Sequence, residues 1–189
     1  MPKLLIVIAS TRPGRVGVPV ADWFHALAAE HGGFELELAD LAVLDLPLLD
    51  EPHHPRLGQY TKEHTRAWSA TVAAADAIVF VTSEYNYGYP AALKNAIDYL
   101  NAEWRYKPVG FVSYGGIAAG TRAVQQLRQV ITGLSMFSVT IAVNIPFVAQ
   151  FLDDDRVVQP NEIMIQAAND MLDELVKVEA ATASLRPRG

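Results

Sequence analysis

Short, largely apolar runs alternate along this chain with stretches that carry an apolar stripe at helical spacing. Residues 3–9, 77–81, 109–112 and 139–143 are runs of the first kind, typical of strands buried on both faces of a sheet. Residues 34–39 instead alternate apolar and polar side chains, which predicts an edge strand with one face in water. Strands that alternate in this way with helices predict a parallel sheet covered by helices on both faces.

Helices are predicted between these strands from apolar side chains three and four residues apart. Pro19 near the start of the first helix and Gly32 past its end suit those two positions. Thr121 is the predicted N-cap of the fourth helix, and the last helix is expected to begin near Asn161. The proline-rich residues 45–60 predict an ordered loop.

Five βα units most often form a flavodoxin-like three-layer sandwich, with a five-stranded parallel sheet of strand order 2-1-3-4-5. This α/β architecture is therefore predicted, as a single domain over residues 1–189. Ligands of such sheets bind beyond the carboxyl ends of the strands, at the switch point between strands 1 and 3. The loops after strands 1, 3 and 4 are thus predicted to carry the chemistry.

The composition of the 189 residues excludes several classes of protein. With 51% hydrophobic and 19% charged residues, the chain has a large core and is not disordered. Its net charge of −6 argues against nucleic acid and anionic membranes as partners. The absence of cysteine excludes disulfides, thiolate zinc sites, iron–sulfur clusters and cysteine nucleophiles. No apolar run approaches the ~18 residues of a membrane span and no signal peptide is visible, so a cytoplasmic protein is expected.

The loop after the first strand has the composition of an anion site. It contains Ser10, Arg12 and Arg15 and leads, past Gly17, into the first predicted helix. The unpaired N–H groups of a helix N-terminus attract anions, and arginine matches the geometry of phosphate oxygens. The loop has neither the G-x-G-x-x-G of a dinucleotide site nor the Gly-Lys-Ser/Thr of a P-loop. A phosphate site is one interpretation, and a polar turn with solvated arginines is the other.

The loop after the third strand is rich in tyrosine. Tyr85, Tyr87 and Tyr89 lie within five residues, with Asn86 and Gly88 between them. A tyrosine offers a flat apolar face and a polar tip, which suits a planar heterocycle. Asn86 and Gly88 suit tight or positive-φ turns that bring backbone donors to the edge of a ring. The alternative is that these tyrosines pack against a helix or another subunit.

The loop after the fourth strand is rich in glycine. Ser113 and Tyr114 precede Gly115 and Gly116, and paired glycines let the backbone approach a flat ligand closely. A flexible turn is the alternative for this loop taken alone. Together, the three loops supply a phosphate site, an aromatic platform and a glycine wall at one edge of the sheet. That set is what a phosphorylated planar cofactor requires.

Three segments resemble the NAD(P)H-dependent FMN reductase family, a flavodoxin-like family that includes quinone, azo-dye and chromate reductases. They are residues 9–12 (Ala-Ser-Thr-Arg), the long motif of residues 84–98, and residues 113–116 (Ser-Tyr-Gly-Gly). The resemblance covers nearly the whole chain. It implies bound FMN as cofactor, with NADPH or NADH as co-substrate. It also implies ping-pong electron transfer to a small-molecule acceptor: a quinone, an azo compound, a metal oxyanion or free flavin.

Carried over by position, the resemblance assigns the FMN phosphate to Ser10 and Arg12, with helix amides near Gly17 and Val18. Arg15 is assigned instead to the phosphates of the nicotinamide cofactor. The isoalloxazine ring is expected to lie against the two later loops, largely against their backbone. The residues assigned to it are Glu84, Tyr85, Asn86, Tyr87, Gly88, Ser113, Tyr114, Gly115 and Gly116.

The first loop departs from the family at two places. The family often has Gly-Ser-x-Arg followed by a serine and an asparagine, where this chain has Ala9 and the segment 15–17. No catalytic side chain is expected, because the chemistry belongs to FMN. No metal site is expected either, because His53 and His54 are adjacent and no carboxylate lies at ligand spacing from them.

The resemblance also implies a homodimer or homotetramer, with FMN near a subunit interface. Residues 45–60 and the tyrosine-rich loop are the expected places for that contact. Two other functions stay open at this point. One is a flavodoxin-type electron carrier without nicotinamide activity, and the other is a flavin-free binding module with the same fold.

Overall fold

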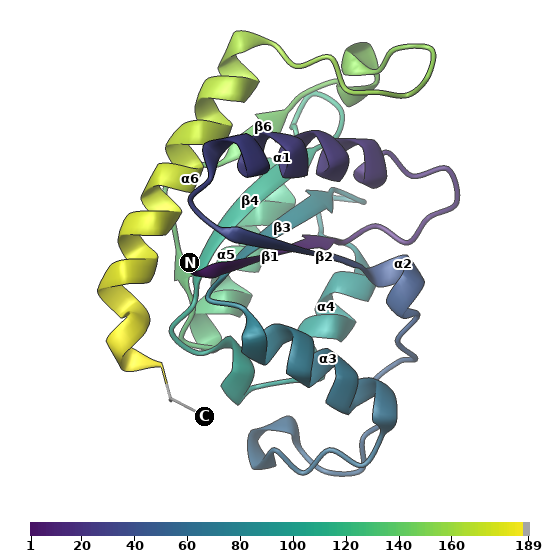
Figure 1. Ribbon diagram of the computed structural model, residues 1–189. Coiled ribbons are helices and arrows are strands. Elements are labelled where there is room, and N and C mark those ends of the chain that lie inside the picture. The colour runs from purple at the N-terminus through teal and green to yellow at the C-terminus, as the bar shows by residue number, and fades with distance from the viewer. Residues whose placement is uncertain (187–189) are drawn as a thin grey trace.

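The computed structural model describes residues 1–186, and its centre is a parallel sheet of strand order β2–β1–β3–β4–β5 (Figure 1). This is the predicted 2-1-3-4-5 order of a flavodoxin-like α/β fold, and the prediction is confirmed. A sixth strand, β6, also pairs with β4. The strands are β1 (Lys3–Ile8), β2 (Glu35–Asp40), β3 (Ala77–Ser83), β4 (Pro108–Tyr114), β5 (Phe137–Ser138) and β6 (Val143–Ile145). Of the predicted 1–189 domain, residues 187–189 lie outside the described residues.

Helices cover both faces of the sheet. One layer contains α1 (Gly17–His31) and α6 (Glu162–Thr182), and the other contains α3 (Glu63–Ala74), α4 (Ala91–Asp98) and α5 (Thr121–Gly133) (Figure 1). A single helical turn, α2 (Leu41–Leu44), follows the edge strand β2. Short 3-10 segments complete the chain at Pro55–Leu57, Ala102–Trp104, Val148–Phe151 and Ala183–Leu185. Among the described residues, no helix is both long enough and apolar enough to cross a membrane.

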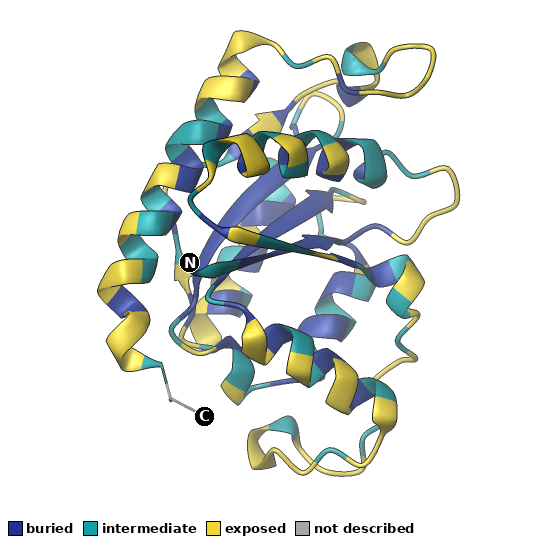
Figure 2. Ribbon diagram, in the orientation of Figure 1, coloured by how far each residue is buried: buried dark blue, intermediate teal, exposed yellow. Residues whose placement is uncertain are grey.

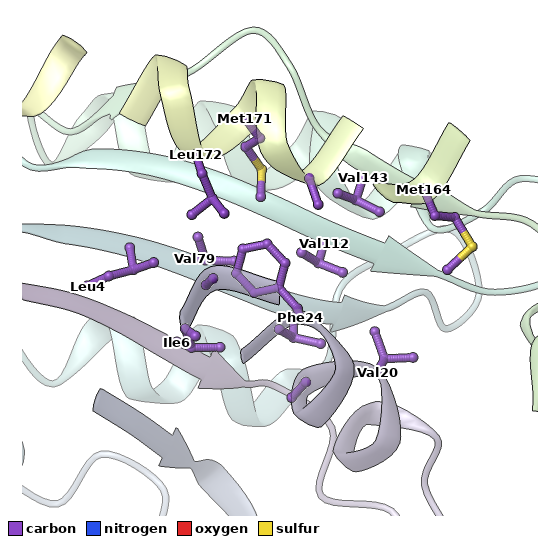
Figure 3. Close-up of a cluster of buried hydrophobic side chains, with 14 of the residues drawn as sticks. Leu4, Ile6, Val20, Phe24, Val79, Val112, Val143, Met164, Met171 and Leu172 are labelled. Atoms are coloured by element: carbon purple, nitrogen blue, oxygen red, sulfur yellow. The ribbon is translucent and has the colours of Figure 1, made fainter. Parts of the chain in front are cut away.

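Each face of the sheet has its own core because successive side chains of a strand point to opposite sides. In β1, Leu4 and Ile6 pack against α1 and α6, whereas Leu5 and Val7 pack against the opposite helices. Phe24 of α1 lies in the first of these cores, between sheet and helix side chains (Figure 3). Figure 2 shows the inner strands buried and the outer helix faces exposed. Burying one such large side chain contributes about 1.5–3 kcal/mol, so both faces hold the sheet firmly.

Most helix ends lie where the sequence predicts them, with one exception. Gly32 ends α1 with φ 71°, and the side chain of Asn161 accepts a hydrogen bond from Met164 N at 2.9 Å at the start of α6. At α5 the cap is Gly120, with φ 77°, and Thr121 is the first helical residue. The predicted Thr121 N-cap is therefore wrong. A Cβ on Gly120 would lie 3.0 Å from the backbone N and O of Tyr114, so the chain needs glycine there.

The predicted last strand, residues 139–143, is wrong in its bounds. The chain pairs with β4 only at β5 and again at β6, and it leaves the ladder in between. Glu174 of α6 accepts hydrogen bonds from Thr140 N at 3.2 Å and Ile141 N at 3.1 Å. Arg128 of α5 donates to the carbonyls of Val139 and Thr140, both at 3.3 Å. Side chains from two helices thus replace the hydrogen bonds of a continuous strand.

The loop formed by residues 45–60 is ordered by contacts with α3 and α4, as predicted. Asn95 donates to Pro47 O at 2.7 Å and accepts from Leu49 N at 2.9 Å. The Tyr99 hydroxyl also donates to Pro47 O at 3.0 Å. The carboxylate of Glu51 accepts from Thr61 N at 2.8 Å, just before α3. These bonds join the loop to two neighbouring helices.

Candidate functional site

Three loops meet beyond the carboxyl ends of β1, β3 and β4: the β1–α1 loop (residues 9–16), the β3–α4 loop (residues 84–90) and the β4–α5 loop (residues 115–120). A hydrogen bond of 2.8 Å between the hydroxyls of Ser10 and Tyr85 joins the first two. Glu84 contacts Arg122 in the first turn of α5 and so joins the second loop to the third. The structure therefore brings together the segments that the sequence analysis assigned to one site.

The N-terminus of α1 points into this region without a side chain to cap it. The N-cap residue is Val16, and the first turn contains no acidic residue. Within the described residues, the N–H groups of Gly17 and Val18 donate no hydrogen bond. Free N–H groups and the positive end of the helix dipole make such a terminus attractive to an anion.

Four hydroxyl groups gather beneath this helix end, from Ser10, Ser83, Tyr85 and Tyr114, and we call them the hydroxyl floor. Ser10, Ser83 and Tyr114 are at most 6% exposed. The oxygens of Ser83 and Tyr114 have no hydrogen-bond partner among the described residues. A Cβ on Gly17 would lie 2.8 Å from the Tyr114 hydroxyl, so this oxygen lies directly against the first turn of α1. Buried hydroxyls without partners are rare and point to a missing ligand atom or water.

Burial raises the pKa of Tyr114 to about 12, although the nearby hydroxyls of Ser83 and Ser10 act in the opposite direction. The phenol therefore stays protonated near neutral pH and can donate a hydrogen bond. Sequence reasoning missed Ser83 as a member of this floor. It ends β3 in register with Tyr114, so the strand pairing was the signal that could have found it.

The two arginines of the β1–α1 loop lie in different surroundings. Arg12 is exposed at the rim of the site, near the Tyr85 hydroxyl. Burial raises the pKa of Tyr85, but the hydrogen bond with Ser10, the nearby Ser83 hydroxyl and the Arg12 guanidinium outweigh it, so the net shift of this pKa is downward. Arg15 instead forms an ion pair with Asp40, whose carboxylate also caps α2 at Ala42 N, 2.9 Å away. Arg12 is therefore the exposed arginine of this loop, and Arg15 is the one held by a carboxylate.

Residues 85–88, which we call the tyrosine turn, form a closed type I′ turn. Tyr85 N donates to Gly88 O at 2.8 Å, and Gly88 N donates to Tyr85 O at 2.9 Å. The two central residues, Asn86 and Tyr87, have φ of 49° and 72°. Asn86 and Gly88 thus both lie in the expected tight turn, with a positive φ at Asn86 and not at Gly88, because the central positions of the turn are residues 86 and 87. A tyrosine in this conformation is strained.

Arg122 and Glu84 hold the tyrosine turn in place. The guanidinium carbon of Arg122 lies 3.7 Å from the centroid of the Tyr87 ring, a cation–π contact. The Glu84 side chain, only 7% exposed, accepts from Arg122 Nε at 2.5 Å and from Arg122 N at 3.2 Å. The Glu84 carboxylate thus caps the first turn of α5.

The β4–α5 loop satisfies most of its own polar groups. The Ser113 hydroxyl, which is buried, donates to Ala119 O at 2.8 Å and lies 2.9 Å from Asn144 Oδ1. Gly115 N donates to Ile145 O at 3.2 Å. A Cβ on Gly116 would meet no atom within 4 Å, so the space beside this residue is open. The side chain of Ser113 thus holds the loop, and the glycines form the exposed wall.

Two hollows lie at or near these loops. One, of about 280 Å³, lies between this turn and the β4–α5 loop, with Tyr87, Gly116 and Arg122 among its lining residues. The other, of about 410 Å³, lies between α2 and the start of α4 and reaches Thr11 of the β1–α1 loop. The site therefore offers a hydroxyl floor, a rigid turn and open space between that turn and the β4–α5 loop.

Comparisons with known proteins agree with this geometry. Residues 2–150 match the family described as NADPH-dependent FMN reductase. The chain is 42% identical over 160 residues to an NAD(P)H-dependent FMN reductase of Schizosaccharomyces pombe, covering 84% of this chain and 77% of that protein. It is 42% identical over 132 residues to an NAD(P)H-dependent FMN reductase of Saccharomyces cerevisiae, covering 66% and 69%.

Solved structures share the fold at lower sequence identity. The flavoenzyme NAD(P)H:(acceptor) oxidoreductase FerB from Paracoccus denitrificans superimposes with a TM-score of 0.76 over 96% of this chain and 99% of FerB, at 20% identity. That identity supports the fold alone, whereas the family match extends over most of the sequence. The chain therefore belongs to the NADPH-dependent FMN reductase family of oxidoreductases.

Proposed function

We propose that this protein is an FMN-dependent NAD(P)H oxidoreductase that passes two electrons to a quinone, an azo compound, a metal oxyanion or free flavin. Family membership supports FMN as the cofactor and NAD(P)H as the reductant. The observation that carries the proposal is the hydroxyl floor, in which buried oxygens without partners lie beneath an uncapped helix N-terminus.

The phosphate of FMN would bind at the N-terminus of α1, beside the hydroxyl floor. The N–H groups of Gly17 and Val18 would donate to phosphate oxygens from above. The hydroxyls of Ser10 and Tyr114 would donate from below, which would give the orphaned Tyr114 oxygen its partner. Arg12 at the rim would add a charge-assisted hydrogen bond. Arg15, paired with Asp40, is left for another role, such as contact with the nicotinamide cofactor.

The ring of FMN would lie against main-chain atoms of the tyrosine turn and of Gly115 and Gly116. When bound, FMN supplies the redox chemistry: it would accept hydride from the nicotinamide and pass two electrons on to the second substrate. The protein binds and orients the reactants. The closed type I′ turn keeps its backbone rigid, and Arg122 fixes the Tyr87 ring beside the hollow of about 280 Å³. No side chain of the site is needed as a nucleophile or a base.

We further propose ping-pong kinetics, in which oxidised nicotinamide leaves before the second substrate enters, because both would use the same open face. A single domain, a cytoplasmic location and a homodimer or homotetramer belong to the same proposal. Exposed apolar side chains in and before residues 45–60, among them Val43, Leu48 and Leu57, suit a subunit contact there. Light scattering on a size-exclusion column tests the subunit number.

Flavin content and reduction by nicotinamide test the central proposal. We expect the purified protein to show flavin absorption after FMN is added, and the bands to bleach with NADPH or NADH under anaerobic conditions. Bound FMN that does not bleach would favour the electron-carrier function instead. Absence of flavin bands even with added FMN would favour a flavin-free binding module. A steady-state screen with a quinone, an azo dye and free FMN then identifies the acceptor, and parallel double-reciprocal lines identify ping-pong kinetics.

A further inference from the structure

A hairpin beyond the residues that match the family lies beside the candidate phosphate site. The match ends at residue 150, and Leu152 pairs with Val158 directly after it in an isolated antiparallel bridge. The Asp153 side chain holds the tip, because its Oδ1 accepts from Asp155 N at 3.0 Å and from Val157 N at 2.8 Å. Val158 is buried in the core on the α1 side of the sheet. The hairpin is therefore anchored to the core and internally hydrogen-bonded.

Arg156 is at the tip of this hairpin, in a backbone conformation with φ 63° that non-glycine residues rarely adopt. Its guanidinium donates to Gly14 O at 3.2 Å and to Arg15 O at 3.1 Å. One side chain thus holds two consecutive carbonyls of the β1–α1 loop from a position 141 residues further along the chain.

These two carbonyls share their peptide units with the N–H groups of Arg15 and Val16. Among the described residues, Arg15 N already donates to Arg12 O, whereas Val16 N donates no hydrogen bond and directly precedes the free donors Gly17 and Val18 at the start of α1. A peptide unit is planar, so a carbonyl that is held on one side directs the following N–H to the other. The loop has one internal backbone hydrogen bond, from Arg15 N to Arg12 O at 3.1 Å. With so little support of its own, the loop depends on outside contacts for its shape.

We propose that Arg156 is a positioning residue for the phosphate site: by holding the carbonyls of Gly14 and Arg15, it directs the Val16 amide, and the first turn of α1 that follows it, toward the anion. The inference rests on the proposed function, because it presumes that FMN phosphate binds at α1. Arg156 acts through the loop and does not touch the ligand. Its removal should therefore weaken binding of a flavin that carries the phosphate, and leave a flavin without it unaffected.

The test compares FMN with riboflavin on the full-length protein after its flavin has been removed. For Arg156→Ala we expect the Kd for FMN to rise about five- to tenfold, below the full effect of a charged phosphate ligand. The Kd for riboflavin should change less than about twofold. An equal rise for both flavins would overturn the proposal, because it would reflect a general loss of structure.

Arg66→Ala is the matched control. Arg66 also donates to two consecutive carbonyls, Tyr60 O at 3.2 Å and Thr61 O at 2.9 Å, in a loop outside the candidate site. The Arg66→Ala variant removes the same positive charge and the same pair of hydrogen bonds to consecutive carbonyls, but far from the candidate site in the sequence. We therefore expect its Kd for FMN to be unchanged. A similar loss of FMN affinity in Arg66→Ala and Arg156→Ala would overturn the assignment.

High salt separates positioning from simple attraction by the Arg156 charge. At about 1 M salt the screening length is only about 3 Å, so a long-range charge effect disappears. We expect the difference in FMN affinity between the unchanged protein and Arg156→Ala to persist there, and its disappearance would overturn the proposal. If the unchanged protein binds no FMN at all, the proposed function itself has failed, and this outcome is distinct from the others.

Discussion

The N-termini of α1 and α5 lie at the same edge of the sheet, each after a strand and a loop that contains glycine, yet they differ in their polar groups. At α5, the carboxylate of Glu84 accepts from Arg122 N, and the β4–α5 loop bonds to itself and to β6. At α1, no side chain of residues 1–186 caps the helix, and the amides of Gly17 and Val18 donate no hydrogen bond within this range. The N-terminus of α5 is already paired with a carboxylate of the protein, whereas the N-terminus of α1 can bind an anion.

The largest effect on stability should come from adding a side chain to the tightly packed β4–α5 loop. In Gly120→Ala the new Cβ would lie 3.0 Å from backbone atoms of Tyr114, in a conformation with φ 77°. We expect a loss of about 2–4 kcal/mol in the free energy of unfolding, from backbone strain and overpacking. Urea unfolding of the flavin-free protein measures it.

Gly14→Ala is the matched variant in the open loop. Gly14 also has a positive φ, of 69°, but a Cβ added to it would meet no atom within 4 Å. The free energy of unfolding should therefore fall only by the cost of a left-handed backbone conformation for alanine, about 1 kcal/mol. Equal losses for the two alanine variants would contradict the view that one loop is packed and the other open.

The second prediction concerns the positive charge of Arg12 near the N-terminus of α1. Arg12→Ala removes an exposed guanidinium beside the hydroxyl floor, so stability should not change. We expect FMN to bind more weakly by roughly 1.5–3 kcal/mol, the scale of a hydrogen bond to a charged group. Fluorescence titration with FMN measures it, and an unchanged Kd would show that the phosphate lies elsewhere.

Tyr114→Phe should act in opposite directions on stability and on binding. Removing a buried hydroxyl without a partner relieves its desolvation, so the flavin-free protein should gain about 1 kcal/mol in unfolding free energy. The same change removes a donor to the phosphate, so we expect FMN affinity to fall about fivefold, or about 1 kcal/mol. Thermal unfolding and FMN titration on one preparation give both values. A loss of stability would indicate that the hydroxyl has a structural partner.

The smallest effect on FMN is expected at Arg15. Its guanidinium is already paired with Asp40, so Arg15→Ala should change the Kd for FMN by less than about twofold. The comparison with Arg12→Ala is made by the same titration. A loss as large as that of Arg12→Ala would mean that the ion pair opens when the ligand binds.

Local patterns were sufficient for the framework of the molecule. Continuous apolar runs predicted β1 and β3, Asn161 marked the start of α6, and Gly32 marked the end of α1. These features depend on neighbours in sequence, where side-chain spacing and backbone conformation act directly. The predictions that failed depend on distant partners. The strand predicted at 139–143 is interrupted because Glu174 and Arg128 bind its backbone from two helices.

The same limit applies within the candidate site. The three loops were predicted to meet, because the carboxyl ends of parallel strands share one edge. The direction of their side chains was not predictable. Arg15 turns to Asp40, Glu84 turns to Arg122, and the hydroxyl of Ser113 holds Ala119 O.

The sequence by itself thus determined the order of the elements, the strand order of the sheet and the edge at which a ligand is expected to bind. Periodic burial and local turn chemistry encode all three. Only the tertiary structure decided which polar groups remain free. It buried the oxygens of Ser83 and Tyr114 under α1, and it brought Arg156 to the loop that starts this helix. Hydrogen-bond partners far apart in sequence become neighbours only when the sheet and its two helical layers have packed.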